Sequence, residues 1–142
     1  MLLLSCKQTC GINAVAIYED GYLVAKQVTR LPSGLGLYDS YITGFRSAFS
    51  FLRCYLEKCI ASGESKLSDV EHVVIECNSS VFTNWLRNGE PKRGFEVAFE
   101  EMWKELDRIP IMYSLVHSKV VKASIYAKES ELPATKLESL DI

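Results

Sequence analysis

One acidic residue stands where an α/β domain usually carries out its chemistry. Glu76 lies at the end of the apolar run His72–Cys77, which predicts a buried strand, and Asn78, Ser79 and Ser80 then lead into an apolar-faced helix. Ligands of open α/β sheets bind just beyond the carboxyl ends of the strands. A carboxylate there could bind a divalent cation, but a lone carboxylate holds Mg²⁺ poorly. We therefore favour a solvated or helix-capping Glu76, where its charge suits the helix dipole.

Three lysines near the end of the chain form a second group of residues that could bind a ligand. Lys119, Lys122 and Lys128 could contact phosphates along one stripe, although charges on a helix are more often simply solvated. The formal net charge is −2, so the whole chain has no general attraction for polyanions. Any binding of branched or duplex DNA is therefore expected to be local and weak.

Large rings on two consecutive expected helices form a third group, which comprises Phe82, Trp85, Phe95 and Phe99. Most such rings belong to the core. A domain of this size often cannot bury every one of them, and exposed rings mark interfaces. We expect some of these residues to contact a protein partner or a second copy of the chain.

Composition limits the class of protein. With 142 residues and 48% hydrophobic side chains, the chain can form one buried core, expected over residues 1–130, with residues 131–142 as a C-terminal tail. The five cysteines are odd in number and include no Cys-x-x-Cys pair, which favours reduced thiols in the cytoplasm. No apolar run is long enough to span a membrane.

The first half of the chain predicts three strands and a long helix. A strand begins at Leu2–Leu4, and Ile12–Tyr18 pairs with Tyr22–Thr29 across Asp20-Gly21, a dipeptide typical of tight hairpins. After a Pro/Gly/Ser loop, apolar residues recur every three or four positions from Tyr38 onward. They predict a helix of about twenty residues. Asp39 or Ser40 is placed to cap its start, and Ser62-Gly63 to end it.

The second half predicts alternating strands and helices. The strand His72–Cys77 precedes a helix with Val81, Phe82, Trp85 and Leu86 on one face, which Asn88–Pro91 ends. A further helix contains Phe95, Phe99, Met102, Trp103 and Leu106. A strand over Ile111–Val116 and a short helix with Val120, Val121, Ser124 and Ala127 complete the domain. Three antiparallel strands followed by parallel crossovers give an α/β, ribonuclease H-like fold with a mixed five-stranded sheet flanked by helices.

Three segments, in this order and spacing, resemble RuvC-type Holliday-junction resolvases, a branch of the ribonuclease H-like superfamily. They are VTRLPSGLGLY at Val28–Tyr38, EHVVIE at Glu71–Glu76 and YSLVHSKVVKAS at Tyr113–Ser124. The resemblance covers roughly Leu2–Lys128.

The resemblance implies four carboxylates that bind two divalent cations for phosphodiester hydrolysis. Glu76 matches the strand-four Glu, whereas Ser5 or Cys6 stands in place of the strand-one Asp. The acidic pair of the last helix is not found in Val120–Lys128. Glu138 and Asp141 are three residues apart and could supply acids only from the tail.

An alignment to ribonuclease H proper places neutral residues at the acidic positions. Gly44 or a neighbour would replace the helix Glu, Asn78 the third acid and Ser124 the last Asp, with His117 as the loop histidine. Both alignments imply the same fold and an incomplete metal site.

The sequence therefore predicts a non-catalytic, RuvC-like domain that works by binding a protein partner or itself, with weak nucleic-acid binding as a further option and no cofactor. The alternative is a Mg²⁺-dependent Holliday-junction resolvase that builds its site from Glu76 together with Glu138, Asp141 or a partner chain's acids.

Overall fold

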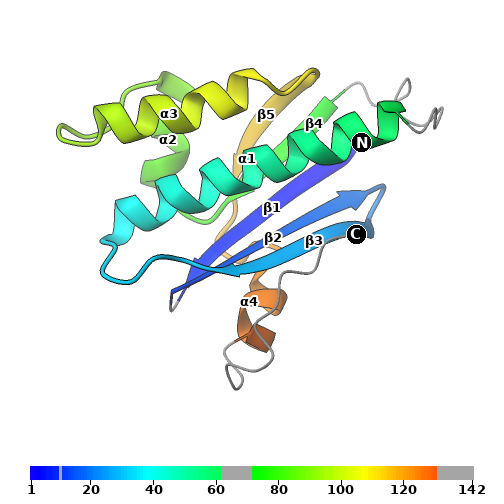
Figure 1. Cartoon of the computed structure of the whole chain (residues 1–142), viewed down its shortest axis with the longest axis horizontal. Coiled ribbons are helices and arrows are strands. Elements are labelled where there is room, and N and C mark those ends of the chain that lie inside the picture. The colour runs from blue at the N-terminus through cyan, green and yellow to red at the C-terminus, as the bar shows by residue number, and fades with distance from the viewer. Residues whose placement is uncertain (10, 62–71, 131–142) are drawn as a thin grey trace.

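The computed structural model describes residues 1–9, 11–61 and 72–130 of the chain, which form one sheet and four helices (Figure 1). In chain order the elements are β1 (Leu2–Thr9), β2 (Ile12–Glu19), β3 (Tyr22–Arg30), α1 (Leu37–Ala61), β4 (His72–Cys77), α2 (Ser80–Asn88), α3 (Glu96–Asp107), β5 (Met112–His117) and α4 (Ser124–Ser130). Within these residues, no helix is both long and apolar enough to cross a membrane.

The sheet has the strand order β3-β2-β1-β4-β5. Strands β1, β2 and β3 pair antiparallel, while β4 pairs parallel with β1, and β5 pairs parallel with β4. The hairpin turn between β2 and β3 forms because Asp20 and Gly21 adopt positive φ angles of 49° and 87°. The predicted mixed five-stranded sheet is confirmed.

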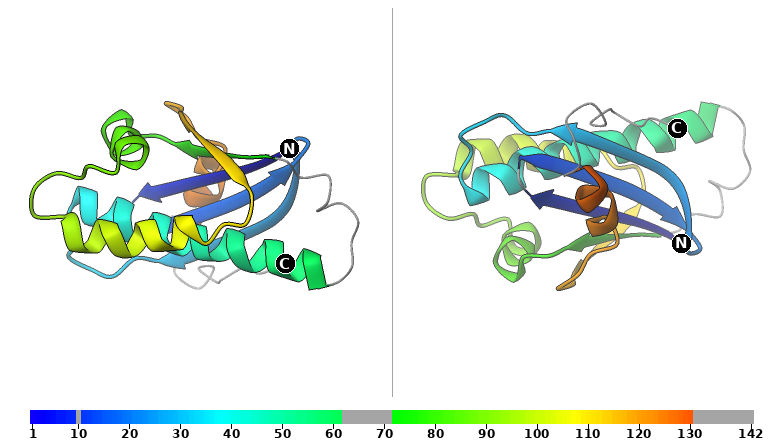
Figure 2. Two further views of the ribbon diagram at one scale, coloured as in Figure 1. Left: turned by 90° about the horizontal axis from the view of Figure 1, so that it is seen from above. Right: turned by 90° about the horizontal axis from the view of Figure 1, so that it is seen from below.

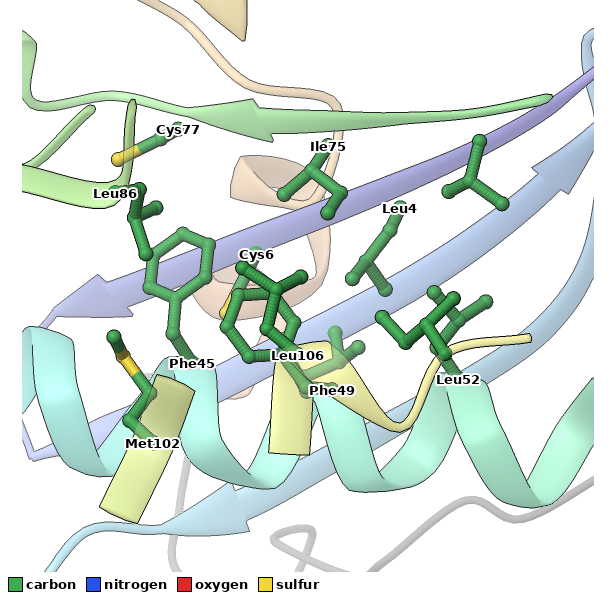
Figure 3. Close-up of a cluster of buried hydrophobic side chains, with 14 of the residues drawn as sticks. Leu4, Cys6, Phe45, Phe49, Leu52, Ile75, Cys77, Leu86, Met102 and Leu106 are labelled. Carbon is green, nitrogen blue, oxygen red and sulfur yellow. The ribbon is translucent and has the colours of Figure 1, made fainter. Parts of the chain in front are cut away.

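Helices cover both faces of this sheet (Figure 2). Helices α1 and α3 pack together over one face, and α4 packs against β1, β2 and β3 on the other. The larger core lies beneath α1, where Phe45, Phe49 and Leu52 contact the apolar side chains of β1 and β4 (Figure 3). A smaller core of Ile12, Ala14, Ala16, Val28, Ala123 and Ala127 lies under α4.

Helix boundaries differ from the predictions at several points. Helix α1 begins at Leu37, so Asp39 and Ser40 lie inside its first turn, and the predicted cap is wrong. Instead, Ser40 donates its hydroxyl to the carbonyl of Gly36 at 2.9 Å. The predicted end at Ser62-Gly63 lies outside the described residues.

Two predicted apolar positions are exposed. Val81 was expected on the apolar face of α2, but 46% of its surface is exposed, and Val120 is 80% exposed because α4 begins only at Ser124.

Strand β5 begins at Met112, one residue later than predicted. The predicted end of α2 is confirmed, since Gly89 adopts the left-handed conformation with a φ of 67°.

The large rings of α2 and α3 belong mainly to the core. Phe82, Trp85 and Phe99 are 0%, 8% and 3% exposed, and Trp85 stacks on Tyr38 with ring centroids 4.6 Å apart. These three rings therefore belong to the core, as expected for most of the group, and are not exposed contact residues. Phe95 is only partly buried, and an interface in this region stays a prediction.

Candidate functional site

Glu76 joins three elements on the α4 face of the sheet. Its Oε1 accepts a hydrogen bond from the Ser5 hydroxyl at 2.9 Å and another from the Lys122 backbone N–H at 2.6 Å. Ser5 Oγ in turn accepts the Ala123 N–H at 2.8 Å. Ser5 and Glu76 are direct partners in the β1–β4 ladder. The Glu76 carboxylate thus ties the segment that leads into α4 to the centre of the sheet.

Glu76 does not cap α2, so that prediction is wrong. The cap is Ser79, whose Oγ accepts the Phe82 N–H at 3.1 Å. Glu76 points to the α4 face and has its hydrogen-bond partners there, while Cys77 next to it faces the large core (Figure 3). This difference follows from the alternation of side chains along a strand.

Two tyrosines and two lysines lie beside the Glu76 network. The hydroxyl groups of Tyr18 and Tyr126 are hydrogen-bonded at 3.4 Å. The Lys122 ammonium lies 5.1 Å from the Tyr18 ring centre, and the Lys26 ammonium 4.6 Å from that of Tyr126. Burial raises the pKa of Tyr18, and its bond to Tyr126 and the nearby Glu76 charge raise it further. Sequence reasoning missed Tyr18, Tyr126 and Lys26, because only the fold brings them together.

The three predicted lysines do not form a stripe along one helix. Lys119 and Lys122 precede α4, and only Lys128 lies within it. All three are exposed. They are therefore accessible to solvent, but their spacing is set by the loop after β5 and not by helical periodicity.

A second polar cluster lies on the opposite face of the sheet, under α1. Gln8 Nε2 donates to Asn13 Oδ1 at 2.9 Å and to Cys6 Sγ at 2.7 Å. Asn13 Nδ2 donates to the Gly44 carbonyl at 3.2 Å. Gln8 Oε1 is buried without a hydrogen-bond partner. The available sequence signals were a glutamine inside an apolar strand and a glycine inside a helix.

Cys6 is not placed as a nucleophile. Burial strongly raises the pKa of its thiol, and the nearby Cys77 thiol raises this pKa further. The hydrogen bond from Gln8 lowers the pKa, but by less than burial raises it. His117 is exposed on the edge strand β5, two strands away from β1. Because the thiolate is the reactive form, this environment makes Cys6 an inert core residue.

The residues around Glu76 do not fit a divalent-metal site. The structure brings together Ser5, Glu76 and the start of α4, which are the positions that the resolvase alignment would fill with acids. Only one of them is a carboxylate, whereas Mg²⁺ and Ca²⁺ require several oxygen ligands. Within the described residues, no group of three or more His, Cys, Asp or Glu side chains could hold a metal ion. Glu138 and Asp141 lie outside those residues.

The positions from the ribonuclease H alignment are also neutral. Gly44 lies in α1 directly over the Gln8–Asn13 pair, Asn78 follows β4, and Ser124 begins α4. A Cβ atom added at Gly44 would lie 2.5 Å from Gln8 Nε2 and 2.8 Å from Asn13 Oδ1. Any larger side chain at this helix position would collide with the polar cluster.

Comparison with known proteins supports the fold. No protein-family model and no curated protein sequence matches the chain. Among solved structures, the RNase H1 from the halophilic archaeon Halobacterium salinarum NRC-1 is similar with a TM-score of 0.56 at 12% identity, covering 87% of this chain and 86% of that one. The LC11-RNase H1 isolated from compost is similar with a TM-score of 0.63 at 14% identity, covering 96% of this chain and 93% of that one.

The chain has a ribonuclease H-like fold. Identities this low show the fold alone and carry no activity across, because one fold hosts many functions. The narrower likeness to RuvC-type resolvases therefore stays a proposal. The function of this ribonuclease H-like chain depends on its own residues.

Proposed function

We propose that this chain is a non-catalytic ribonuclease H-like domain, related to the RuvC type, that acts by binding a protein partner or a second copy of itself. The observation that carries the proposal is the packing at Gly44. The position in α1 that the ribonuclease H alignment assigns to an acid, Gly44, is filled to within 2.5–2.8 Å by Gln8 and Asn13. No carboxylate could enter there without displacing both side chains.

The state of Glu76 supports the same proposal. Its Oε1 already accepts two hydrogen bonds, from Ser5 and from the Lys122 backbone. Both donors lie where the resolvase alignment would place further acids, and neither a neutral hydroxyl nor a backbone N–H supplies the negative charge that a two-metal site needs. Glu76 therefore serves the packing of α4.

The test is a nuclease assay on Holliday junctions, RNA–DNA hybrids and single strands, in Mg²⁺ and in Mn²⁺. We expect no cleavage. Cleavage that disappears in Glu76→Gln would overturn the proposal and establish the alternative, a divalent-metal nuclease. A further variant lacking residues 131–142 would then show whether Glu138 and Asp141 complete its site.

Nucleic-acid binding without cleavage is the second candidate, favoured by the exposure of Lys119, Lys122 and Lys128. Phosphate contacts make affinity fall steeply with salt. Replacing the three lysines by alanine should lower the salt slope by about one unit for each lysine that touches phosphate. No detectable nucleic-acid binding at low salt would support the protein-partner function instead.

A further inference from the structure

The two edges of the sheet differ in how they are protected. At the β5 edge, Arg87 of α2 donates from Nη2 to the Leu115 carbonyl at 2.7 Å, so one backbone carbonyl of β5 already bonds to α2. At the other edge, β3 pairs only with β2 among the described residues. An unprotected edge strand is a template for another extended segment. Within the described part of the chain, β3 is therefore an edge strand whose one strand neighbour is β2 (Figure 2).

A groove of about 630 Å³ lies between β3 and α1. Ala25 of β3 lines it together with Phe51 and Tyr55 of α1. A strand added to β3 would run about 4.8 Å away and would direct every second side chain toward the α1 side of the sheet. Ala25 is buried, and the partly buried Phe51 and Tyr55 give the groove an apolar wall.

The charge around this edge is positive. Strand β3, YLVAKQVTR, contains no acid, and its two basic residues, Lys26 and Arg30, lie on the α4 side together with Val28. Arg46 and Lys58 of α1 line the groove and are exposed. Among the described residues, one carboxylate lines it, that of Glu105, which already pairs with Arg53 and Arg108 at 3.5 Å each. An occupant that carries acids would complement this edge.

We propose that the β3 edge and its groove form a docking site for an extended, acidic segment of a partner protein, which adds to the sheet as a further strand. Backbone hydrogen bonds to β3 would provide affinity, as in other cases of strand addition. Carboxylates beside Arg46 and Lys58 would provide selectivity. This inference rests on the proposed binding function and names its surface and partner chemistry.

The test uses a fluorescein-labelled octapeptide of alternating Val and Glu, with fluorescence anisotropy as the readout. We expect the full chain to bind it, and to bind the matching Val–Lys peptide at least tenfold more weakly. The double variant Arg46→Glu/Lys58→Glu should lose at least tenfold in affinity for the Val–Glu peptide. The matched control, Lys92→Glu/Arg93→Glu, changes the same charges at exposed loop positions and should bind as the unchanged chain does.

Two N-methylated Val–Glu peptides separate strand addition from simple charge attraction. Only every second amide of an added strand faces β3. Methylation of the Val amides or of the Glu amides should therefore abolish binding in one peptide and spare the other. Equal binding of both peptides, or no binding to the full chain, would overturn the proposal.

Two other occupants are distinguishable in the same experiment. If the Val–Glu peptide binds only to a variant that ends at Ser130, the edge belongs to residues 131–142 of this chain. That result would overturn the proposal of a separate partner protein. A dimer of twice 16.0 kDa that Arg46→Glu/Lys58→Glu converts to monomer would assign the edge to a second copy and overturn it as well. Neither result bears on the nuclease assay, so a failure here leaves the non-catalytic function standing.

Discussion

At the scale of single residues, two polar clusters occupy opposite faces of the sheet near the same strand ends. On the α4 face, Glu76 accepts hydrogen bonds from Ser5 and Lys122. On the α1 face, Gln8 and Asn13 fill the space beneath Gly44. In both clusters the polar side chains make hydrogen bonds within the protein, and Glu76 does so where a metal site would need its carboxylate as a ligand. The contribution of each cluster to the fold can therefore be measured as a change in the free energy of unfolding.

Glu76→Ala should destabilise the fold by about 1–3 kcal/mol, because Ser5 and the Lys122 N–H both lose their acceptor. Glu76→Gln retains a side-chain carbonyl oxygen and should cost less. Urea unfolding at neutral pH measures the difference. Equal unfolding midpoints for Glu76→Ala and the unchanged chain would show that the network contributes nothing.

Gly44→Ala should destabilise the fold by about 1–3 kcal/mol, because the new methyl group overlaps the Gln8 side chain at 2.5 Å. Gln8→Ala removes the nearest of the overlapping atoms, so the double variant should lose less than the sum of the two single variants. A double-mutant cycle with a coupling above about 0.5 kcal/mol would confirm the contact. Strict additivity would contradict it.

At the scale of elements, α2 is positioned by its ends and by its rings. Ser79 caps its start, Gly89 ends it, and Arg87 reaches the edge of β5. Its inner face places Phe82 and Trp85 among the rings of α1 and α3. The helix therefore closes the core next to the carboxyl ends of β4 and β5.

Trp85→Ala should destabilise the fold by about 3–5 kcal/mol, because it removes a large ring that is 8% exposed and stacked on Tyr38. Val97→Ala on the exposed face of α3 is a suitable control, since that side chain is 78% exposed. Thermal and urea unfolding measure both changes. Unchanged stability of Trp85→Ala together with lost self-association would restore the interface assignment.

At the scale of the whole molecule, burial of weak acids couples stability to pH. Burial is the main cause of the raised pKa values of Cys6, Cys77 and Tyr113, so the folded chain holds these protons more tightly than the unfolded chain does. The stability from this source is complete below the unfolded-state values, 9.0 for thiols and 10.0 for phenols, and is lost as pH rises through the folded values.

The free energy of unfolding should therefore fall progressively above about pH 9, where the unfolded thiols begin to ionise. Urea unfolding at pH 7.5 and at pH 10.5 measures the loss. Cys6→Ala should make the fall shallower, whereas Cys54→Ala, which removes an exposed thiol, should not. An identical pH dependence in both variants would contradict the assignment of this effect to burial.

Local sequence patterns determined most of the architecture. Alternation of apolar residues predicted the strands, Asp20-Gly21 predicted the hairpin, and the apolar spacing from Tyr38 predicted α1, because each signal acts between neighbours in the chain. The order of these elements then led to the ribonuclease H-like sheet. Ser5 and Gly44 at acidic positions were also visible without any structure.

Only the tertiary structure decided what those positions do. Glu76 accepts a hydrogen bond from the N–H of Lys122, which is 46 residues away in the sequence. Ser5 accepts one from the N–H of Ala123, which is 118 residues away. The burial of Trp85 and the polar pair beneath Gly44 likewise depend on how α1 packs on other elements. Periodicity reports which side of an element is apolar, whereas the partner of a polar group is set by contacts between segments far apart in the sequence.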